Sequence, residues 1–597
     1  MNTVLDQTSA QYATTAHQTP AIEFAGVCKG FTVRKKITEA LRELSFTMSS
    51  GQVVALIGPD GAGKTTLMRL AAGLLHPEQG TIRIFGADTV LDPDGVRSTI
   101  GYMPQRFGLY EDLTVEQNLN LYADLQGVMP RDRAKRFATL LAMGGLTPFT
   151  SRLAGRLSGG MKQKLGLICT LLRTPKLLLL DEPTVGVDPV SRQELWAIID
   201  HATREDGMSV LMSTAYLDEA ERCDRVLILH EGQLLAQGTP TEFASRVQGR
   251  VYTIDVSDED RKQAQRLASC QPGVVDTLLR GTRLRLVLDQ NADRSTLSAQ
   301  LGSLIHSPPR FEDSFIDLLK TKSQSPQENT RPQVQQTPPA SDQSTEEVIR
   351  VDEICKTFGT FKAVDRVSFR VRRGEVFGLL GANGAGKTTC FRMLCGLLPS
   401  TDGQMTVAGI NMRRARSKAR AKIGYMSQGF ALYRELTVAR NLSFFAGAYG
   451  LRGKRMKERI TWAVNEFDLG PVLHARSDRL SLGYKQRLAF ACSLMHQPEI
   501  LFLDEPTSGV DPLARREFWR RIDNLSSQGV TTLVTTHFME EAEYCDHLVI
   551  MVSGRVAAAG TPDDIRLLGS RASEQSPSME EAFLTIVRNQ STHKVGP

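Results

Sequence analysis

The strongest constraint on the fold is that the chain repeats itself. The segment GPDGAGKTT at residues 58–66 recurs as GANGAGKTT at residues 381–389, and LLLLDEPTVGVDP at 177–189 recurs as ILFLDEPTSGVDP at 500–512. Each second copy lies 323 residues after the first (381 − 58 and 500 − 177). One long repeat that covers most of the chain predicts two homologous domains, whereas a solenoid would show many short repeats.

The segments between and around the repeats divide the chain further. Residues 323–347 are rich in Gln, Pro and Ser and hold almost no large apolar side chain, so we expect a flexible linker. Residues 249–322 alternate short apolar runs with a helical pattern, which indicates a small α+β appendage. The predicted division is a disordered tail (1–20), a first domain (21–248), the appendage (249–322), the linker (323–347), a second domain (348–575), and a C-terminal helix and tail (576–597).

Composition restricts the functions that the chain can have. The 72 basic and 66 acidic residues give a net charge of only +6, so the charge balance gives no reason to expect a nucleic-acid partner. The nine cysteines are scattered without a C-x-x-C pair, which favours reduced thiols in a cytosol over a zinc site or disulfides. No apolar run approaches the about 18 residues of a membrane span, and the N-terminal segment lacks the pattern of a secretory signal. We therefore expect any membrane-embedded part of the function to reside in another polypeptide.

Both repeats carry the pattern G-x-x-x-x-G-K-T between a short apolar run and a helical one. This context indicates a P-loop, in which glycine lets backbone N–H groups surround phosphates and the helix N-terminus favours their charge. We expect the lysines to reach the β- and γ-phosphates and the first threonines to ligate Mg²⁺. The candidate nucleotide-binding residues are Gly58, Gly61, Gly63, Lys64, Thr65 and Thr66 in the first repeat, and Gly381, Gly384, Gly386, Lys387, Thr388 and Thr389 in the second.

Each P-loop is followed, further along the chain, by a four-residue apolar run that ends in Asp-Glu. Such a run indicates a buried parallel strand whose C-terminal end carries the chemistry. We expect Asp181 and Asp504 to hold Mg²⁺ through water. The neighbouring Glu182 and Glu505 are expected to polarise the water that attacks ATP.

These motifs stand in the order typical of ATP-binding-cassette (ABC) ATPases, which the chain resembles over residues 20–245 and 347–565. LSGGMKQK at 157–164 is similar to the ABC signature, and LSLGYKQR at 480–487 is a degenerate copy. The resemblance implies two α/β domains, each with a mixed core sheet and a helical signature subdomain. It also implies a head-to-tail arrangement in which each ATP lies between the P-loop of one domain and the signature helix of the other.

The same resemblance implies further site residues. A glutamine in each repeat would approach Mg²⁺ and the attacking water, and an aromatic residue near the start of each would stack on adenine, with a core position on a strand as the alternative. These residues are Gln105 and Gln428, the signature residues Ser158, Gly159, Gly160, Ser481 and Gly483, and the aromatic residues Phe31 and Phe358.

Three kinds of ABC protein carry two cassettes and no membrane span: exporter ATPases, F-subfamily translation factors and sugar-importer ATPases. The Pro- and Gln-rich linker is unlike the charged helical arm of the F subfamily, and the intact second P-loop is unlike the spoiled one usual in the importer class. The segments RFGLYEDLTVEQNL and GFALYRELTVARNL resemble the region where type-two exporters receive a permease helix. The candidate contact residues are Phe107, Leu109, Tyr110, Phe430, Leu432 and Tyr433, for which a core position is the alternative.

The resemblance therefore favours the ATP-hydrolysing subunit of a bacterial export complex that removes drugs or other hydrophobic compounds. The implied cofactors are ATP and Mg²⁺, and the implied partners are two transmembrane permease subunits, with a periplasmic adaptor protein as an additional candidate. We expect a peripheral location on the cytoplasmic face of the inner membrane, with membrane contact made through the permeases. The basic run RRARSKARAK at 413–422 favours a solvated helix face over a contact with anionic lipid, a partner or RNA, so no nucleic-acid partner is expected.

The two repeats differ at two positions that bear on catalysis. The second has His537 in the place of the family's switch histidine, where the first has Ala215. Leu482 replaces the first glycine of LSGG in the second signature, where close approach of backbone to phosphate favours glycine. Because the first P-loop is expected to face the second signature, both changes fall in one composite site, which we predict to be the weaker one.

Overall fold

Two six-stranded sheets, one in each repeat, organise the computed structural model, which describes residues 19–33, 36–105, 108–257, 261–323, 346–413, 419–570 and 577–592. Most of the predicted N-terminal tail and of the linker lies outside these residues, as do Phe107 and the middle of the basic run at 413–422. The core sheet of the first repeat has the order β10-β9-β3-β8-β7-β6, and only β10 pairs antiparallel. Its strands are β3 (Val53–Ile57), β6 (Ile100–Met103), β7 (Leu177–Asp181), β8 (Ser209–Ser213), β9 (Arg225–His230) and β10 (Gln233–Gly238).

Strand β7 shows why the sequence before Asp-Glu is uniformly apolar. Leu178 and Leu180 pack into one hydrophobic cluster, whereas Leu177 and Leu179 pack into another on the opposite face of the sheet. A parallel strand covered on both faces buries every side chain, so its sequence does not alternate between apolar and polar residues. The strand ends where Asp181 meets the P-loop helix.

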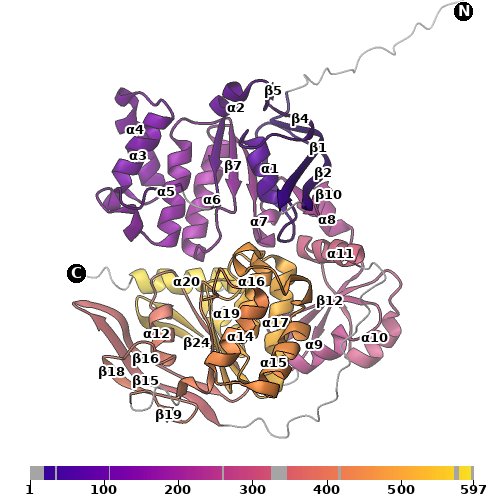
Figure 1. Ribbon diagram of the computed structural model, residues 1–597, viewed down its shortest axis with the longest axis vertical. Coiled ribbons are helices and arrows are strands. Elements are labelled where there is room, and N and C mark those ends of the chain that lie inside the picture. Colours follow the sequence, from indigo (N-terminus) through magenta and orange to yellow (C-terminus); the bar gives the residue numbers. More distant parts are fainter. Residues whose placement is uncertain are drawn as a thin grey trace, which may run out of the picture.

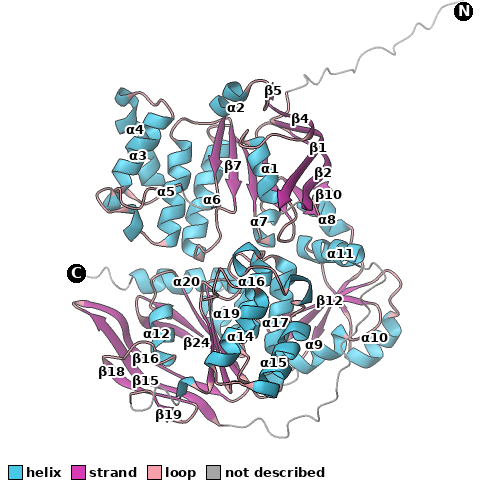
Figure 2. Cartoon of the chain, in the orientation of Figure 1, coloured by secondary structure: helices cyan, strands magenta, loops and turns pink. Residues whose placement is uncertain are grey.

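The remainder of the first repeat, residues 21–248, which we call the first cassette, forms two layers beside the core sheet (Figure 2). An antiparallel sheet of order β2-β1-β4-β5 comprises β1 (Ile22–Val33), β2 (Lys36–Met48), β4 (Gln79–Ile84) and β5 (Ala87–Asp88). The helices α3 (Val115–Leu125), α4 (Pro130–Met143) and α5 (Gly159–Leu171) group together away from that sheet and form the helical subdomain. The remaining helices are α1 (Lys64–Ala71), α2 (Pro93–Thr99), α6 (Pro189–Arg204), α7 (Leu217–Glu221) and α8 (Pro240–Ser245).

The second cassette repeats this plan. Its core sheet has the order β20-β21-β22-β17-β23-β24, and its antiparallel sheet the order β16-β15-β18-β19. The strands are β15 (Glu347–Phe358), β16 (Phe361–Arg372), β17 (Val376–Gly381), β18 (Asp402–Val407), β19 (Ile410–Asn411), β20 (Ile423–Met426), β21 (Ile500–Asp504), β22 (Thr531–Thr536), β23 (His547–Val552) and β24 (Arg555–Gly560). The helices are α12 (Lys387–Leu394), α14 (Val438–Ala448), α15 (Gly453–Glu466), α16 (Leu482–Ser493), α17 (Pro512–Ser527), α18 (Met539–Ala542), α19 (Pro562–Gly569) and α20 (Met579–Thr592).

The appendage after the first cassette is a split βαβ unit. Its elements follow the order β-α-β-β-α-β, and its antiparallel sheet has the order β12-β13-β11-β14. The elements are β11 (Val251–Asp255), α9 (Arg261–Ser269), β12 (Val274–Arg280), β13 (Arg283–Leu288), α10 (Arg294–Leu301) and β14 (Ile305–His306), followed by α11 (Phe311–Ser323). Phe311 and Phe315 of α11 pack into the core of the first cassette, so this helix anchors the appendage.

The appendage also contacts the second cassette, beside which it lies in Figure 1. The buried Arg261 of α9 donates to the carbonyl oxygen of Cys545 and to Asp546 Oδ1, both at 2.8 Å. Lys262 Nζ donates to the other oxygen of Asp546 at 2.6 Å, and Arg266 Nε donates to Asp523 at 2.8 Å. One small domain therefore bridges the two cassettes through paired charges.

Candidate functional site

The first P-loop joins β3 to α1, and its glycines take conformations that few other residues adopt without strain. Gly63 precedes α1 with a φ of 104°, and a Cβ at this position would lie 2.6 Å from the carbonyl oxygen of Ala40. The side chain of Lys64 is buried, and its Nζ donates to the carbonyl oxygens of Gly58 at 2.7 Å and Pro59 at 3.2 Å. The loop and its lysine thus form a closed cradle of the kind that holds phosphates.

The second P-loop repeats this arrangement between β17 and α12. Lys387 Nζ donates to the carbonyl oxygens of Gly381 at 2.6 Å and Ala382 at 3.1 Å, and Gly386 precedes α12 with a φ of 99°. Both loops therefore present the backbone N–H groups of a helix N-terminus beside a buried lysine. The other predicted P-loop residues lie in the same two loops and first helical turns, namely Gly61, Thr65, Thr66, Gly384, Thr388 and Thr389.

The aspartates at the ends of the core strands fit the predicted Mg²⁺ role. Thr65 Oγ1 donates to Asp181 Oδ1 at 3.4 Å, and Ser213 Oγ donates to the same oxygen at 2.7 Å. Asp181 is buried, yet its Oδ2 has no hydrogen-bond partner within the described part of the chain. A buried carboxylate oxygen without a donor, beside a threonine hydroxyl, suits a hydrated Mg²⁺. In the second cassette, Thr535 Oγ1 donates to Asp504 Oδ1 at 2.6 Å, and burial raises the pKa of Asp504.

Each predicted glutamate is paired with its predicted glutamine. Gln105 Nε2 donates to Glu182 Oε2 at 2.6 Å, and Gln428 Nε2 donates to Glu505 Oε2 at 2.6 Å. Glu182 and Glu505 have φ angles of 51° and 48°, in the left-handed region that non-glycine residues occupy at an energetic cost. That strained turn carries each carboxylate out of the strand and towards the P-loop at the carboxyl edge of the sheet.

The two glutamates have different neighbours beyond their glutamines. His537 is buried, and its Nδ1 lies 3.4 Å from Glu505 Oε2. Burial favours protonation of Glu505, but His537, Lys387 and Gln428 outweigh it and lower the pKa of this carboxyl group. Glu182 has only Ala215 at the place of the histidine, and burial raises its pKa. The predicted catalytic carboxylates of the two cassettes therefore sit in different electrostatic surroundings.

The P-loop of each cassette contacts the other cassette across the interface. The backbone N–H of Gly483, in the second signature, donates to Asp60 Oδ2 of the first P-loop at 3.1 Å. Asn383 of the second P-loop donates through Nδ2 to the carbonyl oxygen of Gly186, in the GVDP turn of the first cassette, at 3.2 Å. The structure thus brings the first P-loop to the second signature in a head-to-tail arrangement.

The signature serines cap their helices. Ser158 Oγ accepts from the N–H of Met161 at 3.3 Å, and Ser481 Oγ accepts from that of Tyr484 at 3.4 Å. Gly159 and Gly160 begin α5, so their N–H groups belong to its N-terminus, where an anion is favoured.

Leu482 begins α16 and packs on the turns between the cassettes. A Cβ placed on Gly509 would lie 3.1 Å from Leu482 Cδ2 and 3.1 Å from Val185 Cγ1. The Leu482 side chain therefore lies beside Gly509 in the GVDP turn of its own cassette, and Val185 of the first cassette lies beside the same glycine. Its predicted crowding of the phosphate stays a prediction.

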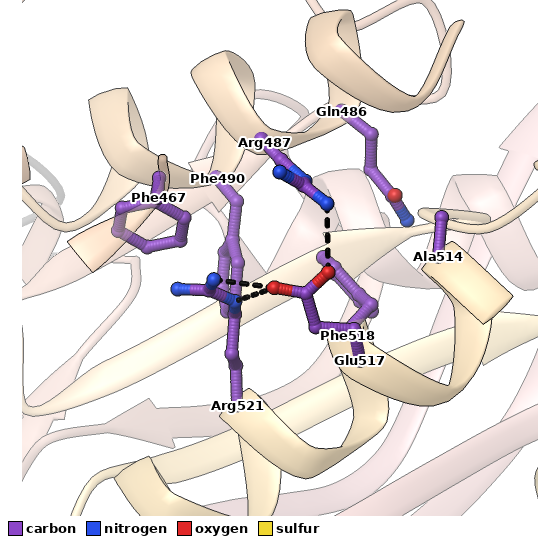
Figure 3. Close-up of a pocket in the computed structure, with 8 residues that line it drawn as sticks. All are labelled: Phe467, Gln486, Arg487, Phe490, Ala514, Glu517, Phe518 and Arg521. Atoms are coloured by element: carbon purple, nitrogen blue, oxygen red, sulfur yellow. Dashed lines mark hydrogen bonds and ion pairs between the residues drawn. The ribbon is translucent and has the colours of Figure 1, made fainter. Parts of the chain in front are cut away.

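The second signature helix is fastened to the core of its cassette by a charged cluster that lines a small pocket (Figure 3). Arg487 of α16 donates to Glu517 of α17 at 2.8 Å, and Arg521 donates to the same carboxylate at 2.5 Å. In the first cassette, Lys164 and Glu194 make the corresponding contact at 2.7 Å. These pairs hold the signature helix α5 on α6 and the signature helix α16 on α17.

The residues that follow the two switch positions meet each other. The rings of Tyr216 and Phe538 lie 5.1 Å apart, and the Arg515 guanidinium lies over both, at 5.3 and 5.2 Å from their centroids. Beside them, Arg192 of the first cassette donates to Glu580 of α20 at 2.7 Å. These contacts join the cassettes immediately behind Ala215 and His537. The sequence motifs gave no signal for this pairing beyond the matching positions of Tyr216 and Phe538 in the two repeats.

The predicted adenine-stacking residues lie on strands but not in the core. Phe31 on β1 is 40% exposed and Phe358 on β15 is 50% exposed. Lys29 Nζ and Lys356 Nζ lie 5.7 and 5.2 Å from their ring centroids. The core alternative for these residues is wrong, and their stacking on adenine stays a prediction.

Known proteins are similar to this chain over nearly its whole length. The ABC transporter family matches residues 41–185 and 364–508, one span in each cassette. The probable multidrug ABC transporter ATP-binding protein YbhF of Escherichia coli K12 is 49% identical over 556 residues, which are 92% of this chain and 95% of that protein. The chain belongs to the ATP-binding proteins of ABC transporters. Its two cassettes are ABC ATPase domains, so the predicted fold class, ATP cofactor and ATPase activity are confirmed.

Shorter relatives of this ABC chain match part of it. The linearmycin resistance ATP-binding protein LnrL of Bacillus subtilis is 37% identical over 246 residues, 40% of this chain and 79% of that protein. The daunorubicin/doxorubicin resistance ATP-binding protein DrrA of Streptomyces peucetius is 36% identical over 285 residues, 47% of this chain and 81% of that protein. Within the described ranges, no helix of this chain is both apolar enough and long enough to traverse a bilayer.

Proposed function

We propose that this chain hydrolyses ATP to power the export of drugs or other hydrophobic compounds through two separate permease subunits. The observation that carries the proposal is the similarity to YbhF, which extends along nearly the whole length of both chains. YbhF is named as a probable multidrug ABC transporter ATP-binding protein. Two relatives of single-cassette size are named for resistance to linearmycin and to daunorubicin or doxorubicin. None of the three is named as a translation factor or an importer ATPase, which were the alternatives.

The proposed location follows from the proposed partners. ATP-binding proteins of exporters work with membrane permeases, and the permeases would place this chain on the cytoplasmic face of the inner membrane of a bacterium. A periplasmic adaptor protein would extend such a complex. Fractionation of cells with and without the permeases tests the location, because the chain should sediment with membranes only when the permeases are present.

The segments after Gln105 and Gln428 are the proposed permease contact. Tyr110 is 56% exposed and Tyr433 is 48% exposed, whereas Leu109, Phe430 and Leu432 pack partly against the core. A surface aromatic side chain held in a fixed position suits the recognition of a partner helix.

A buried asparagine fixes each of these tyrosines. Asn118 Oδ1 accepts from the N–H of Tyr110 at 2.9 Å, and Asn118 Nδ2 donates to the carbonyl oxygen of Tyr110 at 3.0 Å. Asn441 makes the same two contacts with Tyr433, at 3.0 and 3.1 Å. Local sequence patterns did not identify these asparagines, although both follow the LTV motif in the duplicated segment.

Variants at the two tyrosines test the permease contact. The double variant Tyr110→Ala, Tyr433→Ala should co-purify poorly with the permeases while it still binds ATP. Leu91→Ala is the matched control, because Leu91 is an apolar side chain that is 86% exposed and lies outside the proposed contact. Equal co-purification of both variants would contradict the proposed surface.

We also propose that the two composite ATP sites are unequal. The site built on Lys387, Glu505 and His537 has the complete set of predicted catalytic groups, whereas the site built on Lys64 and Glu182 lacks the histidine. The second site would therefore perform most of the turnover.

Equilibrium binding of Mg-ATP to a Glu182→Gln, Glu505→Gln variant should give about two nucleotides per chain. A stoichiometry of one would contradict the two-site arrangement.

A further inference from the structure

The two P-loops differ at two positions, and the motif does not reveal the contacts made by the second of them. The first P-loop has Asp60 where the second has Asn383, in GPDG and GANG respectively. Asn383 is neutral and donates to a carbonyl oxygen of the opposite GVDP turn. Asp60 instead accepts from the backbone N–H of Gly483, at the N-terminus of the signature helix α16. The same loop position thus makes opposite kinds of contact in the two cassettes.

The contact of Asp60 places a carboxylate where an anion is favoured. Helix α16 runs from Leu482 to Ser493, and the unpaired N–H groups of its first turn attract negative charge. In the proposed function, this helix end receives the γ-phosphate of the ATP bound to Lys64. The Asp60 carboxylate and that phosphate therefore need the same N–H group.

The surroundings of Asp60 add a second carboxylate. Asp511, at the start of α17, lies with its Oδ2 3.5 Å from the backbone nitrogen of Asp60. Burial, followed by the charge of Asp511, raises the pKa of Asp60, whereas Lys64 and the N–H of Gly483 lower it. A carboxylate in this position faces the charge of its neighbour and would face that of a phosphate as well.

We infer that the Asp60 side chain acts as an internal anion that occupies the second signature and must leave it before ATP can close the first composite site. The inference rests on the proposed function, because it takes that site to bind ATP between Lys64 and the second signature. Asp60 is thereby a positioning residue that weakens nucleotide binding at the first site only. Asn383 carries no charge and imposes no such competition at the second site.

The test is an exchange of the two residues in the full-length chain. Glu182→Gln, Glu505→Gln is the background, and equilibrium dialysis with Mg-ATP measures both dissociation constants. Asp60→Asn should tighten the weaker site about ten-fold, the order expected for removing one like charge close to a phosphate. The reverse exchange, Asn383→Asp, should weaken the other site to a similar degree. Adding Lys64→Ala to Asp60→Asn should abolish the gain, which assigns it to the first site.

Further variants distinguish the loss of the Asp60 charge from other effects of the substitution. Asp60→Ala removes the carboxylate without adding an amide, so it should tighten the same site as Asp60→Asn does. A gain with Asp60→Asn alone would mean that the new amide contact matters, and the inference would be wrong. Unchanged dissociation constants in chains that still bind two ATP would also overturn it while leaving the proposed function intact. Failure of the background chain itself to bind ATP would overturn both.

Discussion

The difference between the two ATP sites leads to a quantitative prediction about turnover. In the second cassette, His537 is buried and its Nδ1 lies 3.4 Å from Glu505 Oε2, so the ring can hold both the carboxylate and the attacking water. Ala215 stands in that position in the first cassette and can do neither. Losing one such polar contact in a transition state lowers the rate by about 10²–10³, which corresponds to roughly 3–4 kcal/mol.

The natural absence of the histidine therefore predicts a large imbalance. The first site should contribute less than about a tenth of the total ATPase rate, since it already lacks a contact of this size. Glu505→Gln should remove most of the steady-state activity, whereas Glu182→Gln should leave most of it. His537→Ala should lower the total rate by at least about ten-fold, because both sites would then lack the histidine.

The assay is phosphate release by the complex reconstituted with its permeases, at saturating Mg-ATP. Glu182→Gln serves as the matched control for Glu505→Gln, because both variants remove one catalytic carboxylate and keep its volume. Equal losses from the two variants would refute the assignment of the active site. Full activity at the first site after Ala215→His alone would show that Leu482 has no effect on that site.

Three further predictions concern stability and assembly. His547 Nδ1 lies 2.7 Å from Glu375 Oε1, a contact that raises the pKa of His547 above its value of about 6.5 in an unfolded chain. The stabilisation by this pair is thus present at low pH and is lost as pH rises through the raised pKa of His547. His547→Gln should therefore lower Tm more near pH 6 than near pH 8.5. An equal loss of Tm at the two pH values would contradict the pairing. Arg261→Ala combined with Lys262→Ala should release the appendage from Asp546, which both side chains contact, and expose it to limited proteolysis. Breaking a buried ion pair costs about 3–5 kcal/mol, and an unchanged digestion pattern of the double variant would argue against the bridge. Phe490→Ala, at a fully buried ring in α16, should reduce the unfolding free energy of the second cassette by about 3–5 kcal/mol in urea denaturation, and a loss below 1 kcal/mol would show that the site is loosely packed.

The parts of the candidate site that short sequence motifs predicted are local. A P-loop is a continuous segment whose glycines, lysine and helix start are adjacent in the chain, so its pattern survives in the sequence. The strand before Asp-Glu is likewise continuous, and its burial on both faces makes it apolar throughout. Gln105 was inferred as a site residue from the order of motifs in a known family, whereas its hydrogen bond to Glu182 was found only in the structure.

Other parts depended on how distant segments come together. The contact of Asp60 with Gly483 joins residues 423 positions apart, and that of Arg261 with Asp546 joins residues 285 positions apart. The composition of the chain did not predict either contact, because a single aspartate or arginine can occur on many kinds of surface. The small α+β character of the appendage could be predicted from its alternating runs, but its docking on the second cassette could not.

By itself, the sequence determined that there are two cassettes, and it predicted the loop where each would hold phosphate and the histidine that the first of them lacks. Those properties follow from short segments whose backbone conformation and side chains form a unit on their own. Only the tertiary structure decided that Tyr216 meets Phe538 behind the switch positions and that Asp60 reaches the opposite signature. The physical reason is that these contacts form where the surfaces of two folded cassettes meet. Whether two surfaces are complementary cannot be predicted from the sequence of one segment alone.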